Sequence, residues 1–131
     1  MNSKAWALLD HYSALTFTWG VSDCFLFAAH MQDTLHGTSL YTTHKGKYHC
    51  KRSAIQYFYT HTGQRTFKNA LETIWQKSTS DKVRGAVILR ENACGIYLGR
   101  YSVFRSPVGV TYMPSSLQDV PLSPKKACQT P

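Results

Sequence analysis

Apolar residues follow a helical period through the first half of the chain and strand-like patterns through the second half. The clearest helical segment begins at Ser22 or Asp23 and ends at His36, where Gly37 is suited to stop it. Its apolar positions are Phe25, Leu26, Phe27, Ala28, Ala29 and Met31. Because these residues cover a wide face, the pattern predicts a central and heavily buried helix.

Three further helices are predicted in the first half of the chain. They cover residues 3–11, 51–62 and 66–76, the last one capped by Thr66. Residues 37–47, which are rich in Thr, Gly and Lys, are expected to form a loop.

Four short strands are predicted in the second half, after a polar connector at 77–84. They cover residues 86–89, 95–99, 101–106 and 108–113, and the last two are expected to pair across a turn at Pro107. Helices followed by a meandering antiparallel sheet define an α+β domain. We expect this domain to span residues 1–117, and residues 118–131, which contain several prolines, to form an extended tail without a core.

The composition fits one ordinary domain with a hydrophobic core. The chain has 131 residues, of which 43% are hydrophobic and 13% aromatic, so full disorder is excluded. No apolar run approaches the roughly 18–20 residues that span a bilayer. The first residues lack the apolar stretch and cleavage site of a secretory signal.

Positive charge dominates, with 15 Lys and Arg against 7 Asp and Glu and a net charge of +8. This balance suits acidic partners such as an anionic cell-wall polymer, an acidic neighbouring subunit or nucleic acid. Nucleic acid is the least favoured of these, because no basic recognition helix or basic strand interleaved with aromatics is present.

The four cysteines, Cys24, Cys50, Cys94 and Cys128, contain no CxxC pair. We therefore expect no structural metal and no cofactor, and reduced thiols. Cys94, at the start of a strand, could contact Cys24, and the sequence leaves this alternative open.

One motif carries chemistry: Trp19-Gly20-Val21-Ser22-Asp23-Cys24. If the central helix begins near Asp23, then Cys24 lies in its first turn, where the helix dipole and free N–H groups lower the pKa of a thiol. A nucleophilic cysteine is positioned in this way, whereas Asp23 is expected to cap the helix.

This motif resembles the nucleophile region of NlpC-type, papain-like cysteine peptidases, which cleave peptidoglycan stem peptides. It is more similar still to a family of short phage and prophage proteins encoded near tail-tip genes. Further matching segments are Gly46-Lys47-Tyr48, Gly85-Ala86-Val87-Ile88, Gly95-Ile96-Tyr97-Leu98-Gly99, Gly109-Val110 and Met113-Pro114. The resemblance covers about residues 8–117 and implies a papain-like fold. Residues on these motifs that are candidates for binding are Trp19, Asp23, Tyr48 and Tyr97.

The catalytic histidine of such a peptidase is missing at its usual place. The resemblance puts it two residues before Gly95, where this chain has Ala93, and all six histidines lie at or before His61. His44 and His49 are the remaining base candidates for Cys24.

The resemblance therefore implies a structural or adaptor protein of a phage tail tip or baseplate with a degenerate peptidase fold. Its partners would be other tail proteins, such as hub, distal tail or tip proteins, and peptidoglycan. The chain would be made in the host cytoplasm and reside in the virion. The alternative is a tail-associated peptidoglycan hydrolase that acts during infection, with Cys24 as nucleophile and His44 or His49 as base.

Overall fold

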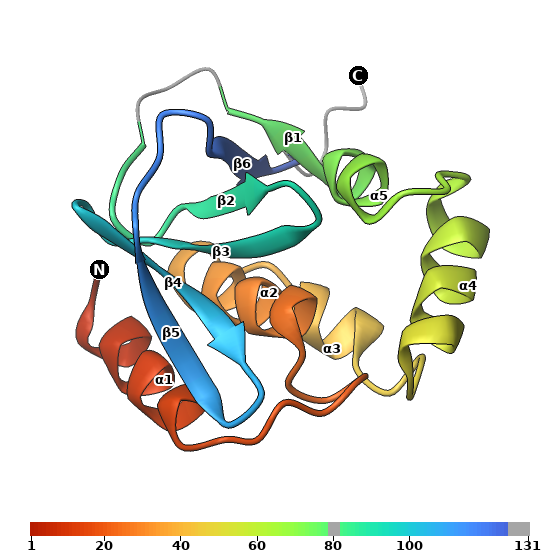
Figure 1. The fold of residues 1–131 in the computed structure, drawn as a ribbon, viewed down its shortest axis with the longest axis horizontal. Coiled ribbons are helices and arrows are strands. Elements are labelled where there is room, and N and C mark those ends of the chain that lie inside the picture. Colours follow the sequence, from red (N-terminus) through yellow and green to blue (C-terminus); the bar gives the residue numbers. More distant parts are fainter. Residues whose placement is uncertain (79–81, 126–131) are drawn as a thin grey trace.

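The computed structural model describes residues 1–78 and 82–125 and has the expected α+β class. The helices of this part of the chain are α1 (Ser3–Ser13), α2 (Cys24–His36), α3 (Leu40–His44), α4 (Lys51–Thr62) and α5 (Phe67–Ile74). The strands are β1 (Trp75–Lys77), β2 (Val87–Arg90), β3 (Ala93–Tyr97), β4 (Tyr101–Ser106), β5 (Gly109–Pro114) and β6 (Val120–Pro124). They form one antiparallel sheet in the order β1-β6-β2-β3-β4-β5 (Figure 1).

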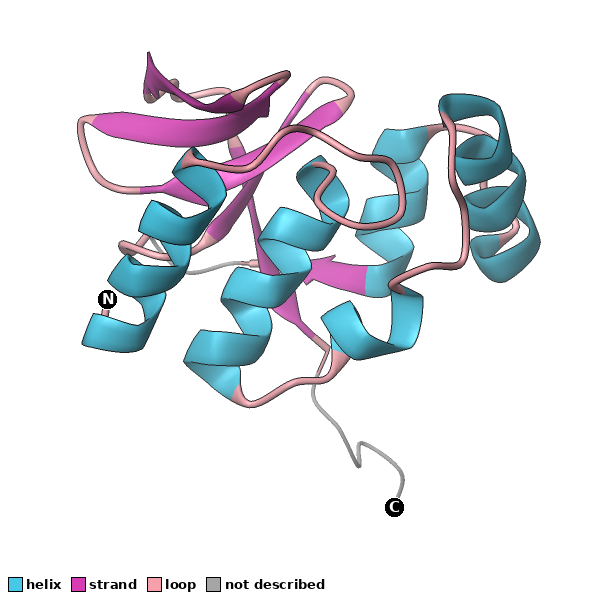
Figure 2. Ribbon diagram, turned by 90° about the horizontal axis from the view of Figure 1, so that it is seen from below, coloured by secondary structure: helices cyan, strands magenta, loops and turns pink. Residues whose placement is uncertain are grey.

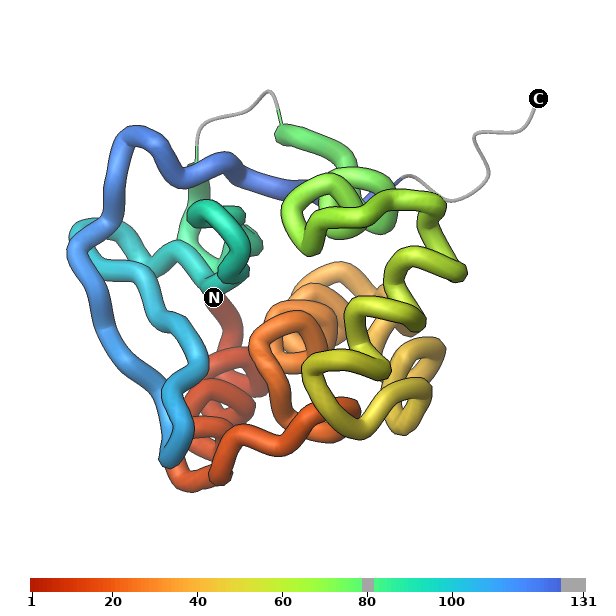
Figure 3. Tube along the Cα trace, turned by 45° about the vertical axis from the view of Figure 1, so that its right-hand side comes forward, coloured from red at the N-terminus to blue at the C-terminus, as the bar shows by residue number. Residues whose placement is uncertain are grey.

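Helix α2 lies at the centre of the molecule, as its apolar pattern predicts. It packs against β3 and β4, with α1 beside it on the same side of the sheet (Figure 2). Seen along its axis, α2 has the sheet on one side and α4 on the other (Figure 3). Asp23 caps its start by accepting a hydrogen bond from the Leu26 N–H at 3.0 Å, and Gly37 ends it with φ of 71°.

Two predicted boundaries are wrong in the middle of the chain. The expected loop at 37–47 contains the short helix α3, which packs on α2. The helix expected to reach Gln76 ends at Ile74, because Trp75 is extended and begins β1. The Trp75 side chain is fully buried and its ring contacts Phe25 at a centroid distance of 5.4 Å. The helix therefore ends where the buried Trp75 begins β1 and pairs with β6.

The expectation of an extended tail without a core is wrong for residues 120–124. Strand β6 lies inside the sheet between β1 and β2, and its Leu122 is buried. The carbonyl of Pro121 accepts a hydrogen bond from the Ser78 N–H, so Pro121 faces the end of β1 and its missing N–H removes no bond to β2. Residues 126–131, at the end of the expected tail, and residues 79–81 of the expected connector lie outside the described residues.

An ion pair between the partly exposed Arg90 and the buried Asp119 fixes the segment that leads into β6. Arg90 of β2 binds both carboxylate oxygens of Asp119, at 2.6 and 2.8 Å. Burial favours a raised pKa for Asp119, but the hydrogen bonds from Arg90 and from the Ser116 N–H outweigh it and lower the pKa. None of the helices in residues 1–78 and 82–125 has the length and hydropathy of a membrane-spanning helix.

The side chain of Arg105 on β4 joins three parts of the chain. Its guanidinium donates hydrogen bonds of 2.7–2.9 Å to backbone carbonyls of four residues, and it lies over the Tyr12 ring at 5.4 Å. The acceptors are Tyr12, Leu15, Ser22 and Gly109. Arg105 thereby holds the end of α1 and the loop before α2 against the β4–β5 hairpin, and so positions the start of α2.

We expect Arg105→Lys to lower the free energy of unfolding by about 3 kcal/mol, because lysine cannot reach these carbonyls together and leaves several of them unpaired. Urea unfolding followed by circular dichroism measures the loss. Arg100→Lys is the matched control, because Arg100 is exposed and none of the hydrogen bonds above involves its side chain; an equal loss in both variants would contradict this role of Arg105.

Candidate functional site

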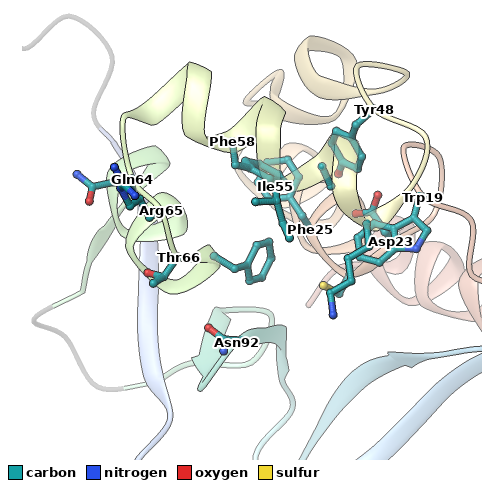
Figure 4. A pocket seen from close by; sticks show the side chains of 14 residues that line it. Trp19, Asp23, Phe25, Tyr48, Ile55, Phe58, Gln64, Arg65, Thr66 and Asn92 are labelled. Atoms are coloured by element: carbon teal, nitrogen blue, oxygen red, sulfur yellow. The ribbon is translucent and has the colours of Figure 1, made fainter.

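A cleft of about 440 Å³ opens at the start of α2, between that helix, α4 and the loop that joins α4 to α5 (Figure 4). Its lining residues are Trp19, Asp23, Cys24, Phe25, Tyr48, Lys51, Ala54, Ile55, Phe58, Gln64, Arg65, Thr66, Phe67 and Asn92. The motif around Cys24 therefore supplies one wall, as the sequence indicates. The opposite wall comes from α4, from the loop after it and from Asn92 in the β2–β3 turn.

Gly20 and Asp23 build the wall that carries the cysteine. The Gly20 N–H donates to the Asp23 carboxylate at 2.8 Å, and the Gly20 carbonyl accepts from the Gly46 N–H at 2.8 Å. Asp23 is only 1% exposed, and burial raises the pKa of its carboxyl although the N–H groups of Leu26 and Gly20 oppose the shift. Asp23 is thus a buried cap that holds the preceding loop and the first turn of α2 together.

Cys24 lies in the first turn of α2, half-buried and on the cleft wall. A hydrogen bond with the thiol of Cys94 is the largest cause of a lowered pKa for Cys24, while burial and the charge of Asp23 oppose it. The Cys94 thiol also donates to the backbone carbonyl of Cys24 at 3.3 Å. Cys24 therefore has the position and the lowered pKa of a nucleophile.

Aromatic side chains surround this cysteine. Tyr48 is 4% exposed, and its hydroxyl is buried beside Asp23 without a hydrogen-bond partner among the described residues (Figure 4). Burial, followed by the Asp23 charge, raises the pKa of Tyr48. Trp19 is half-buried and packs edge-on against Phe17 at 5.1 Å. Three of the four binding candidates, Trp19, Asp23 and Tyr48, therefore line the cleft.

The two base candidates lie elsewhere. His44 is 2% exposed and its Nδ1 is hydrogen-bonded to the Tyr57 hydroxyl at 2.6 Å, while His49 is exposed. All six histidines belong to the described part of the chain, and none of them lines the cleft. Tyr97, the remaining binding candidate, is half-buried on β3 and does not line the cleft either.

The sequence did not indicate the α4 side of the cleft. Ile55 and Phe58, one turn apart on α4, supply apolar surface there, and Lys51 and Arg65 bring positive charge. The spacing of Ile55 and Phe58 could have indicated a shared face on the helix. Only the packing of α4 opposite α2, however, shows which aromatic side chain of this helix enters the cleft.

The described lining of the cleft offers the thiol of Cys24 but no histidine imidazole. Among the residues that the structure describes, no group of three or more His, Cys, Asp or Glu side chains could hold a metal ion. The cleft can receive a ligand with apolar and acidic groups, and it places one cysteine against that ligand.

An α+β domain with a cysteine at the start of its central helix is the class that fold and site define. The family model described as "Domain of unknown function (DUF6950)" matches residues 2–120, and the chain belongs to this family. No curated protein and no solved structure matches the chain.

We expect Gly20→Ala to destabilise the protein much more than Gly46→Ala. Both glycines have positive φ, of 80° and 75°, which costs a side chain roughly 1–2 kcal/mol. A Cβ on Gly20 would lie 1.8 Å from the Tyr48 carbonyl oxygen, whereas a Cβ on Gly46 meets nothing within 4 Å. The clash should add roughly 1–3 kcal/mol. Urea unfolding of both variants tests this, and equal losses would show that Tyr48 does not confine Gly20.

We expect His44 to make the free energy of unfolding decrease as the pH is lowered. Burial, together with His61, lowers the pKa of His44 to about 4 in the folded state, against about 6.5 unfolded. As pH falls from 6.5 towards 4, the unfolded chain therefore takes up a proton that the folded chain does not, and the free energy of unfolding decreases.

Urea midpoints at several pH values between 7.5 and 5 measure this dependence. It should be weaker in His44→Asn, although not absent, because burial also lowers the pKa of His30. The exposed His49 provides the control variant His49→Asn, which should keep the wild-type dependence. An unchanged slope in His44→Asn would refute the assignment.

Proposed function

We propose that this protein is a structural adaptor of a bacteriophage tail tip or baseplate, with an NlpC-type, papain-like fold that has lost its general base. The observation that carries this proposal is the pairing of Cys24. Its position at the start of a helix is that of a peptidase nucleophile, but the side chain that reaches it from β3 is the thiol of Cys94. No histidine of the described chain lines the cleft.

The missing imidazole weighs against catalysis. A general base typically contributes about 10²–10⁴-fold to the rate, and nucleophile and base act as a unit. His44 is buried and hydrogen-bonded to Tyr57, and its low pKa makes it a weak proton acceptor. The phage assignment itself rests on the similarity of the Trp-Gly-x-x-Asp-Cys and Gly-Ile-Tyr-Leu-Gly motifs to the tail-tip family.

The surface suits a protein that is held by neighbours. Apolar side chains are exposed on the β4–β5 hairpin and beside it: Tyr101, Val108, Tyr112, Met113 and Leu117. The net charge of +8 favours acidic neighbours. Other tail proteins, such as hub, distal tail or tip proteins, are the proposed partners, and the virion is the proposed location.

The second candidate is a tail-associated peptidoglycan hydrolase. One observation favours it, namely that Cys24 combines a lowered pKa with a place on the cleft wall. In that case the cleft would hold a stem peptide, and Cys24 would be the nucleophile.

Complementation of a phage that lacks this gene product separates the two functions. We expect purified virions to contain the protein, and Cys24→Ser to restore plaque formation to within about twofold of wild type, as Cys50→Ser should. Gly20→Ala should restore it poorly, because it disturbs the fold around the same cleft without touching the thiol. Immunoblots of the virions check incorporation of each variant.

Muropeptide release by the purified protein completes the test. The adaptor predicts the same background release from wild type and Cys24→Ser. Absence of the protein from purified virions would overturn the adaptor. Normal virions that carry Cys24→Ser but fail to infect, together with release that depends on Cys24, would establish the hydrolase.

A further inference from the structure

Two thiols that are 70 positions apart in the sequence meet beneath the cleft. Cys94 on β3 is fully buried, and its Sγ donates to the backbone carbonyl of Cys24 at 3.3 Å. Helix α2 packs directly on β3 at this point. Both cysteines are reduced in the structure.

The two thiols differ in access and in acidity. Cys24 lines the cleft and is half-buried, so a small solute can reach it, whereas Cys94 has no exposed surface. The hydrogen bond with Cys94 lowers the pKa of Cys24, and burial raises the pKa of Cys94 well above the ordinary value. An accessible thiol that ionises first, in contact with a buried thiol that keeps its proton, is the arrangement of an attacking and a resolving cysteine.

We propose that Cys24 and Cys94 form a redox-active pair, which a hydroperoxide converts into a disulfide between the start of α2 and β3. The Cys24 thiolate attacks one peroxide oxygen, so that an S–O bond forms, the O–O bond breaks and hydroxide leaves. Cys94 then loses its proton and attacks the Cys24 sulfur. The S–S bond forms, the S–O bond breaks and the oxygen leaves as water. In sum, two thiols and one hydrogen peroxide give one disulfide and two waters.

The proposal of a redox-active pair does not depend on the proposed function. Oxidation would occupy Cys24 in either an adaptor or a hydrolase, and it would link the base of the cleft to the sheet. A third thiol, that of Cys50, also has a lowered pKa, mainly because of its hydrogen bonding with Ser53, but it caps α4 and does not line the cleft. It is therefore replaced by serine in the test.

The test uses the full chain with Cys50→Ser and Cys128→Ser, which leaves Cys24 and Cys94 as its thiols. Serine at position 50 keeps a capping oxygen for α4. After treatment with a small excess of hydrogen peroxide, intact mass should fall by two hydrogens, and peptide mapping should find Cys24 joined to Cys94. Dithiothreitol should restore the original mass. Circular dichroism before and after treatment checks that the chain stays folded.

Two results would overturn the proposal. One is a Cys24 that becomes sulfinic or sulfonic acid while Cys94 stays reduced, and the other is a folded chain in which both thiols remain unreacted. A further variant with Cys94→Ala should let dimedone trap sulfenic acid on Cys24, which the parent should not; Cys24→Ser should abolish reaction altogether. If Cys94→Ala fails to fold, disulfide mapping on the parent still decides. None of these measurements requires virion assembly or muropeptide cleavage.

Discussion

The site depends on the hydrogen bonds that the guanidinium of Arg105 donates to four backbone carbonyls. The guanidinium binds backbone carbonyls at the end of α1, in the loop before α2 and in β5, so one side chain from the sheet holds the loop that leads into α2. A half-buried arginine can replace the lost hydration of these carbonyls because its planar fork presents several donors at once. The positions of Asp23 and Cys24 follow from this anchoring, since both lie directly after the loop that it holds.

The cleft carries the Cys24 thiol on its wall, and the thiol of Cys94 lies against the same residue. Asp23 accepts hydrogen bonds from the N–H groups of Gly20 and Leu26. The partner of Cys24 is another thiol. Sulfur next to sulfur offers no proton acceptor near neutral pH when the second thiol is buried, but it does offer oxidation to a disulfide.

Local signals predicted much of the helical half. The capping residues Asp23, Gly37 and Gly63 mark their helix ends, because caps act through bonds to residues three or four positions away. The β4–β5 hairpin was likewise predictable from alternation around Pro107. The prolines near the C-terminus were misleading, because only the pairing of Pro121 with the end of β1 shows that its missing N–H removes no bond to β2.

The sequence by itself determined the α+β class, the buried central helix and the presence of Cys24 in its first turn, because each depends on neighbouring residues and on the period of apolar positions. Tertiary structure alone decided that β6 joins the sheet, that His44 is buried against Tyr57, and that Cys94 meets Cys24. These contacts join segments far apart in the chain, and their geometry depends on how α2, α4 and the sheet pack. No local pattern of residues records that packing.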